Sequence, residues 1–150
     1  MTQLTLGKLS QDKLTIEPVL EGNTLTLCLA GTSDSFSVKA LGLYLGEVTE
    51  EVARLGLSSV AFDVTKLGLL NSSSLKQFIT FLRPIKLGTL KFTVEFLVDD
   101  QIPWQRRCLA ALVRMCPIDV SVRDINGGGP GNGSRSIPYA ASSATLRRPS

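Results

Sequence analysis

The chain has 150 residues, of which 43% are hydrophobic and 19% charged, and this composition fits one globular domain. It contains three cysteines and no histidine, which argues against the usual zinc sites, a redox pair and the commonest general base. No apolar run reaches the ~18 residues of a membrane span, and Met1–Leu9 lacks the apolar stretch of a secretory leader. We therefore expect a cytoplasmic protein that keeps free thiols and does not enter the membrane.

The net charge of +3 is unevenly distributed. Residues 126–150 contain Arg135, Arg147 and Arg148 and no acidic residue, which leaves 13 basic and 13 acidic side chains in residues 1–125. No clustered basic stripe is evident in this neutral part, so the sequence argues against nucleic-acid binding.

The first predicted elements are two strands and a helix. Apolar side chains alternate over residues 14–19 and again over 25–31, and the turn residues Glu21-Gly22-Asn23 between them predict a β-hairpin. Val38, Leu41, Leu45, Val48, Val52 and Leu55 then recur at spacings of three and four. This spacing predicts a one-face amphipathic helix that Gly56 closes.

Strands and helices alternate in the next part of the chain. Residues 59–64 read as a strand that runs into a loop, and a helix follows whose apolar face extends from Leu75 to Leu82 and which Pro84 is expected to end. A strand over 92–98, a helix that opens at Pro103 and a strand over 118–122 complete the pattern. The order β-β-α-β-α-β-α-β predicts an α/β fold, with a mixed, mostly parallel sheet that begins with an N-terminal β-hairpin.

Residues 126–150 begin with a glycine-rich run and cannot bury enough apolar surface to offset the entropy of ordering. We predict one domain over residues 1–125 and a disordered tail over 126–150. A short docking peptide around Ile137, Pro138 and Tyr139 is the alternative for the tail.

The best functional clue is the serine run that begins the second predicted helix. Ser72, Ser73 and Ser74 follow Asn71, so small hydroxyls are placed where backbone N–H groups are free and the helix dipole favours negative charge. A phosphoryl group would be stabilised there. Plain helix capping by serine explains the same residues without any switch, and both interpretations stay open.

The element order over about residues 12–123 resembles the STAS domain, the fold of bacterial anti-sigma factor antagonists. Three segments carry the resemblance: Leu25–Gly31, the Asp-aliphatic-Thr strand Phe62–Thr65, and the loop Asn71–Leu75 at a helix start. The chain departs from the family pattern twice, because Asn71 stands where an aspartate is usual and Ser74 where a glycine is usual.

The resemblance implies a non-enzymatic regulator without cofactors. It would bind an anti-sigma factor of the serine-kinase type and be switched by phosphorylation at Ser72, with Ser73 as the alternative, while a phosphatase restores the unmodified form. Asp63, Asn71, Ser74 and Leu75 would support the serine loop or contact the partner.

Other interpretations remain open at this point. Asp63 fits a hydrogen-bonded structural aspartate equally well. A scaffolding STAS module that self-associates, for example as a homodimer, and is never phosphorylated is the main alternative function. A small-ligand carrier would need a pocket that the sequence does not indicate.

Overall fold

A computed structural model describes residues 4–11 and 13–125. The predicted disordered tail at residues 126–150, with its candidate docking peptide at Ile137, Pro138 and Tyr139, lies outside the described residues.

The described chain alternates strands and helices in the predicted order, with one additional strand at the start. The elements are β1 (Leu9–Gln11), β2 (Leu14–Glu21), β3 (Thr24–Ser33), α1 (Val38–Leu55), β4 (Ser59–Leu70), α2 (Ser72–Lys86), β5 (Thr93–Val98), α3 (Pro103–Met115) and β6 (Val120–Asp124). The three-residue β1 is too short to give a period in the sequence, which is why it was not predicted.

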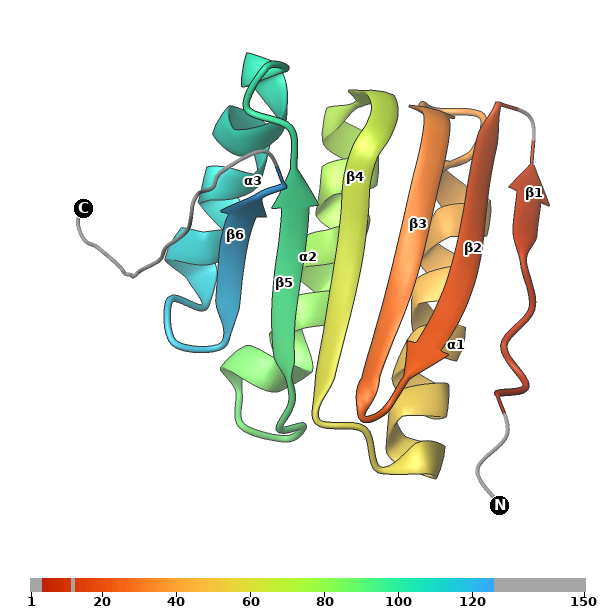
Figure 1. The fold of residues 1–150 in the computed structure, drawn as a ribbon, viewed down its shortest axis with the longest axis vertical. Coiled ribbons are helices and arrows are strands. Elements are labelled where there is room, and N and C mark those ends of the chain that lie inside the picture. The colour runs from red at the N-terminus through yellow and green to blue at the C-terminus, as the bar shows by residue number, and fades with distance from the viewer. Residues whose placement is uncertain (1–3, 12, 126–150) are drawn as a thin grey trace.

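The six strands form one sheet in the order β1-β2-β3-β4-β5-β6. The first three strands pair antiparallel and the pairs from β3 to β6 are parallel. The predicted α/β class, the N-terminal hairpin and the mostly parallel sheet are therefore confirmed. All three helices lie on one face of the sheet (Figure 1), so each parallel crossover passes over the same side.

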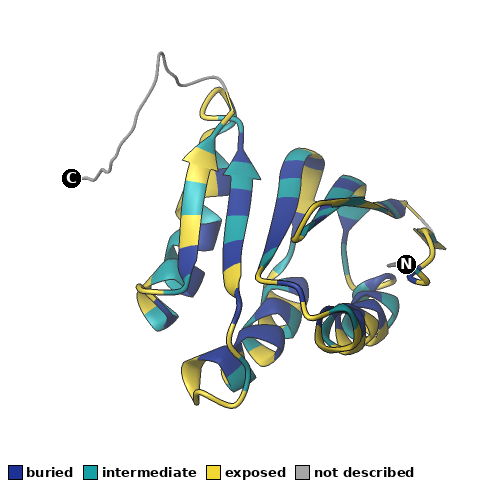
Figure 2. Ribbon diagram, turned by 60° about the horizontal axis from the view of Figure 1, so that its bottom comes forward, coloured by how far each residue is buried: buried dark blue, intermediate teal, exposed yellow. Residues whose placement is uncertain are grey.

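The core lies between the sheet and the helices. Three fully buried aromatic rings meet at its centre: Phe62 of β4, Phe78 of α2 and Phe96 of β5, with ring centroids 5.2–5.7 Å apart. Side chains along the strands alternate between buried and more exposed positions (Figure 2). This alternation is what a sheet covered on one face requires, and it explains the period of two in the sequence.

Three predicted boundaries outside β4 were wrong. β3 does not end at Gly31 but continues to Ser33, because β4 also continues and stays paired with it. Helix α2 passes through Pro84 and ends at Lys86, since a proline in the last turn removes only one hydrogen bond, that to the carbonyl of the exposed Thr80. The last strand begins at Val120, while Ile118 lies before it in the turn that follows α3 and is 92% exposed.

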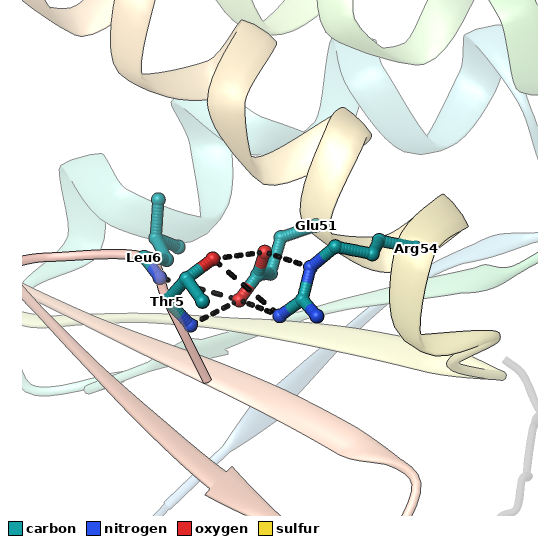
Figure 3. A network of polar contacts seen from close by, with 4 residues as sticks. All are labelled: Thr5, Leu6, Glu51 and Arg54. Atoms are coloured by element: carbon teal, nitrogen blue, oxygen red, sulfur yellow. Dashed lines mark hydrogen bonds and ion pairs between the residues drawn. The ribbon is translucent and has the colours of Figure 1, made fainter. Parts of the chain in front are cut away.

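A network around Glu51 fixes the N-terminal segment against α1 (Figure 3). The buried Glu51 carboxylate accepts hydrogen bonds from the backbone N–H groups of Thr5 and Leu6, from the Thr5 hydroxyl and from the Arg54 guanidinium. These donors, the Arg54 side chain first, lower the pKa of Glu51 from 4.5 to about 2. The Tyr44 hydroxyl adds a bond to the carbonyl of Gly7 at 2.7 Å. Residues 5–7 are thus attached to the helix by charge-assisted and neutral hydrogen bonds.

Candidate functional site

The second half of β4 leads directly to Asn71 and to the serine run that begins α2. The sequence predicts a loop after Val64, but the strand continues to Leu70, paired only with β3. Its pairing with β3 shifts register twice, between Cys28 and Ala30 and between Gly31 and Thr32 of β3, and each shift inserts an extra β4 residue. The loop prediction was wrong because bulges disturb the period of two that identifies a strand.

Asp63 stabilises the first of these bulges. One oxygen of its carboxylate accepts hydrogen bonds from the backbone N–H of Thr65 at 3.0 Å and from the Thr65 hydroxyl at 2.6 Å. The described contacts of Asp63 are therefore local to β4, as in the structural interpretation, and do not reach the serines. The Asp-aliphatic-Thr pattern has a physical reason here, since the aspartate and the threonine close a turn within the strand.

Gln105 of α3 forms hydrogen bonds to the same bulged part of β4. This side chain is fully buried, and its amide nitrogen donates to the carbonyls of Val64 at 2.8 Å and Leu67 at 3.3 Å. Its amide oxygen accepts from the backbone N–H of Asp99 at 2.9 Å. The glutamine thus supplies the partners that β5 no longer provides once β4 has diverged from it.

Asn71 caps α2 and joins it to β3. Its side-chain oxygen accepts from the backbone N–H of Ser74 at 2.8 Å, and its own backbone N–H donates to the carbonyl of Ser33 at 3.0 Å. An extended backbone at Asn71 turns the chain from strand into helix. A neutral asparagine therefore performs the capping that the more usual aspartate would perform at this position.

Ser74 has its hydroxyl inside the fold. Ser33 and Ser74 are both fully buried, and the Ser33 hydroxyl donates to that of Ser74 at 2.8 Å. Ser74 lies in the regular first turn of α2, so a glycine is not required there for backbone conformation. Of the three serines, this one is unsuited to modification or to direct contact with a partner.

Ser72 and Ser73 are exposed at the first two positions of α2. In the described part of the chain no acceptor is bonded to their backbone N–H groups, whereas the next two N–H groups, of Ser74 and Leu75, bond to Asn71. The first turn of α2 contains no acidic residue, and the exposed Lys76 lies one turn further on. An added phosphoryl group would therefore meet free N–H donors, the positive end of the helix dipole and one cation.

Two exposed apolar side chains lie at the same end of the sheet as these serines, where β3 and β4 end. Leu69 of β4 is 49% exposed and pairs with Thr32 of β3, and Phe36, in the connection from β3 to α1, is 79% exposed. Leu75, by contrast, is half-buried and packs against the core. We group the exposed residues at this end of the sheet, Ser72, Ser73, Phe36 and Leu69, as the serine surface.

The predicted site residues thus separate into two groups. The exposed Ser72 and Ser73 sit at the helix start, while Asp63, Asn71, Ser74 and Leu75 shape or support the fold beneath them. Sequence reasoning missed Ser33, Gln105 and Phe36. Only Phe36 carried a usable signal, because it is a large apolar residue among the loop residues Ser35 and Ser37.

The described residues contain no cluster of acidic, histidine or cysteine side chains that could hold a metal ion. None of the helices in the described ranges is long and apolar enough to cross a membrane.

Comparisons with known proteins identify the fold. No family model matches the sequence, and no curated protein matches it. Among solved structures, the chain is similar to an anti-sigma factor antagonist from Mycobacterium paratuberculosis, with a TM-score of 0.56 and 16% sequence identity. The match covers 75% of this chain and 88% of that one. The STAS-like fold that the sequence motifs indicate is thereby confirmed.

Proposed function

We propose that this chain is a non-enzymatic regulatory module that binds a serine-kinase-type partner through the serine surface. Phosphorylation of Ser72, or of its neighbour Ser73, weakens this binding, and a phosphatase restores it. The exchange takes place in the cytoplasm, where the free Cys28, Cys108 and Cys116 stay reduced. The fold shared with an anti-sigma factor antagonist supports this class of function.

The observation that carries the proposal is the difference in burial among three consecutive serines. Ser74 is fully buried and bonded within the fold, while Ser72 and Ser73 are exposed beside unpaired backbone N–H groups. Capping alone does not explain the exposed pair, because Asn71 already provides the cap. A kinase can therefore reach these two hydroxyls without unfolding α2.

The exposed apolar side chains explain why a phosphoryl group would disrupt binding. Phe36 and Leu69 are suited to a desolvated contact with a partner. A phosphoryl group on Ser72 adds about −1.5 to −2 charge next to that contact, and burying this charge without a matching cation is costly. Lys76 and the helix N-terminus stabilise the modified form in the unbound protein, which favours dissociation further.

The test uses the full chain and the partner isolated with it from its source cells. Binding is measured for the wild type before and after treatment with kinase and ATP, and for a Ser72→Ala/Ser73→Ala double variant under both conditions. We expect the kinase to abolish binding of the wild type and to leave the double variant bound. Ser121→Ala, which removes an exposed serine on β6, is the matched control and should behave as the wild type.

Two binding results would contradict the proposal. Binding that kinase treatment leaves unchanged, or that is lost in the double variant as in the wild type, would contradict it. A stable homo-oligomer with no partner and no modification would support the scaffolding alternative instead.

A further inference from the structure

A second surface lies at the opposite end of the strands from the serines. Strands β4, β5 and β6 run parallel, so their first residues lie together at one end of the sheet (Figure 1). Two of the connections at this end are residues 87–92, between α2 and β5, and residues 116–119, between α3 and β6. We call the surface formed by these connections the amino-end surface.

The amino-end surface contains a hollow of about 390 Å³. Apolar side chains of Ile85, Leu90 and Phe92 line it, together with Lys91 and with Asp119, the only carboxylate in its lining. A hollow of this size and lining suits a large apolar side chain supplied by a partner.

Large apolar residues also project beside the hollow. Leu87 is 72% exposed and precedes Gly88 of the lining, and Ile118 is 92% exposed and precedes Asp119. Single exposed apolar residues are common on proteins. Two of them next to an apolar hollow form a patch typical of protein contacts.

The charge around this patch is positive. Arg83 and Lys86 lie in the last turn of α2, Arg114 in the last turn of α3, and Lys91 in the connection after α2. All four are exposed, and within the described residues none forms an ion pair. Favourable interaction with the helix dipoles accounts for cations at the ends of α2 and α3, but not for Lys91, which lies outside both helices.

From this combination we infer that the amino-end surface binds an acidic segment of a partner protein that carries a large apolar anchor residue. The anchor occupies the hollow between Leu90 and Phe92, and flanking carboxylates face the four cations. This contact is independent of the serine surface, so the chain can join two partners at once. A protein segment fits better than an anionic membrane, because an apolar side chain of a partner can fill the hollow lined by Ile85, Leu90 and Phe92, whereas insertion into lipid would leave it unfilled.

The probe is a fluorescein-labelled octapeptide with a central Phe-Leu pair and three acidic residues on each side. Anisotropy gives the affinity for the full chain, and amide NMR shifts locate the site. We expect shifts at Gly88, Leu90, Lys91 and Ile118 and none at Ser72 or Ser73. Binding should weaken with added salt and should be lost for a peptide in which Ser-Ser replaces Phe-Leu.

A charge-reversal variant tests the cations. Lys86→Glu/Lys91→Glu should weaken binding by about tenfold, because two attractions become repulsions. The control Lys13→Glu/Lys39→Glu makes the same change in net charge at exposed sites away from the amino-end surface, and it should bind as the wild type. Both variants alter exposed side chains, and circular dichroism is used to check that they fold.

Several results would overturn the inference. These are no binding of the octapeptide at millimolar concentration, equal loss in the two variants, equal binding of a peptide in which lysines replace the acids, or shifts confined to the serine surface. Sedimentation of the chain with phosphatidylserine vesicles, without peptide binding, would assign the surface to membranes instead. None of these results depends on phosphorylation, so they leave the proposed function untouched.

Discussion

Replacing Glu51 by glutamine removes a buried charge while keeping the size of the side chain, and it tests the N-terminal network quantitatively. The Glu51 side chain is 6% exposed and accepts bonds from Thr5, Leu6 and Arg54. Its pKa falls from 4.5 to about 2. Because each pKa unit corresponds to about 1.4 kcal/mol, ionisation of Glu51 stabilises the folded state by at most about 3.5 kcal/mol. The Arg54 side chain is 47% exposed, so solvent screening reduces this figure to about 2 kcal/mol.

The pH dependence follows from the direction of this shift. A carboxylate whose pKa is lower in the folded state contributes its full stability above the unfolded pKa of 4.5, and this stability is lost as pH falls toward 2. We expect Glu51→Gln to be less stable than the wild type by about 2 kcal/mol near pH 7, with more than half of that difference gone by about pH 3.

The assay is urea unfolding followed by circular dichroism and by fluorescence of Trp104, the only tryptophan in the sequence. Glu50→Gln is the matched control, because this neighbouring glutamate on α1 is exposed and its loss should change stability by less than about 0.5 kcal/mol. A Glu51→Gln effect that is the same near pH 7 and pH 3, or no larger than the Glu50→Gln effect, would refute the reasoning.

Three further substitutions test the framework of the site by thermal or urea unfolding. Gly31 has φ of +96°, and an added Cβ would lie 1.9 Å from the carbonyl oxygen of Lys13. Gly31→Ala should therefore cost on the order of 3 kcal/mol or prevent folding. A variant as stable as the wild type would show that the Lys13 carbonyl does not lie this close to Gly31. Gln105→Leu removes the three hydrogen bonds that Gln105 makes to the Asp99 N–H and to two β4 carbonyls, and it should cost about 2–3 kcal/mol. A neutral effect would show that these bonds do not stabilise the bulged part of β4. Asn71→Asp places a charge at the N-terminus of α2 and should stabilise the chain by about 0.3–1 kcal/mol, less so in high salt; destabilisation would argue against the cap geometry.

The alternation of strands and helices could be predicted from the sequence, because each element shows one apolar face to a single core. Leu25, Leu27 and Leu29 follow a period of two, and α1 follows a helical period, since only one side of the sheet is covered. The position of Ser72 at a helix start was equally accessible, because Asn71 and the serine run are capping residues.

The details of the site required the three-dimensional structure. The extension of β4 depends on bulges and on Gln105, which lies 41 residues from Val64 in the sequence. That Ser74 faces inward follows from its contact with Ser33, also 41 residues away. Local patterns cannot reveal such pairs, because both partners are ordinary polar residues whose burial is decided by tertiary packing.

Site-resolved mass spectrometry of the chain isolated from its source cells tests the central claim most directly, if the partner-bound and free pools are analysed separately. The switch predicts one phosphoryl group on Ser72 or Ser73 in the free pool and none in the bound pool. A phosphoryl group found equally in both pools, or modification absent from both serines in both pools, would contradict it.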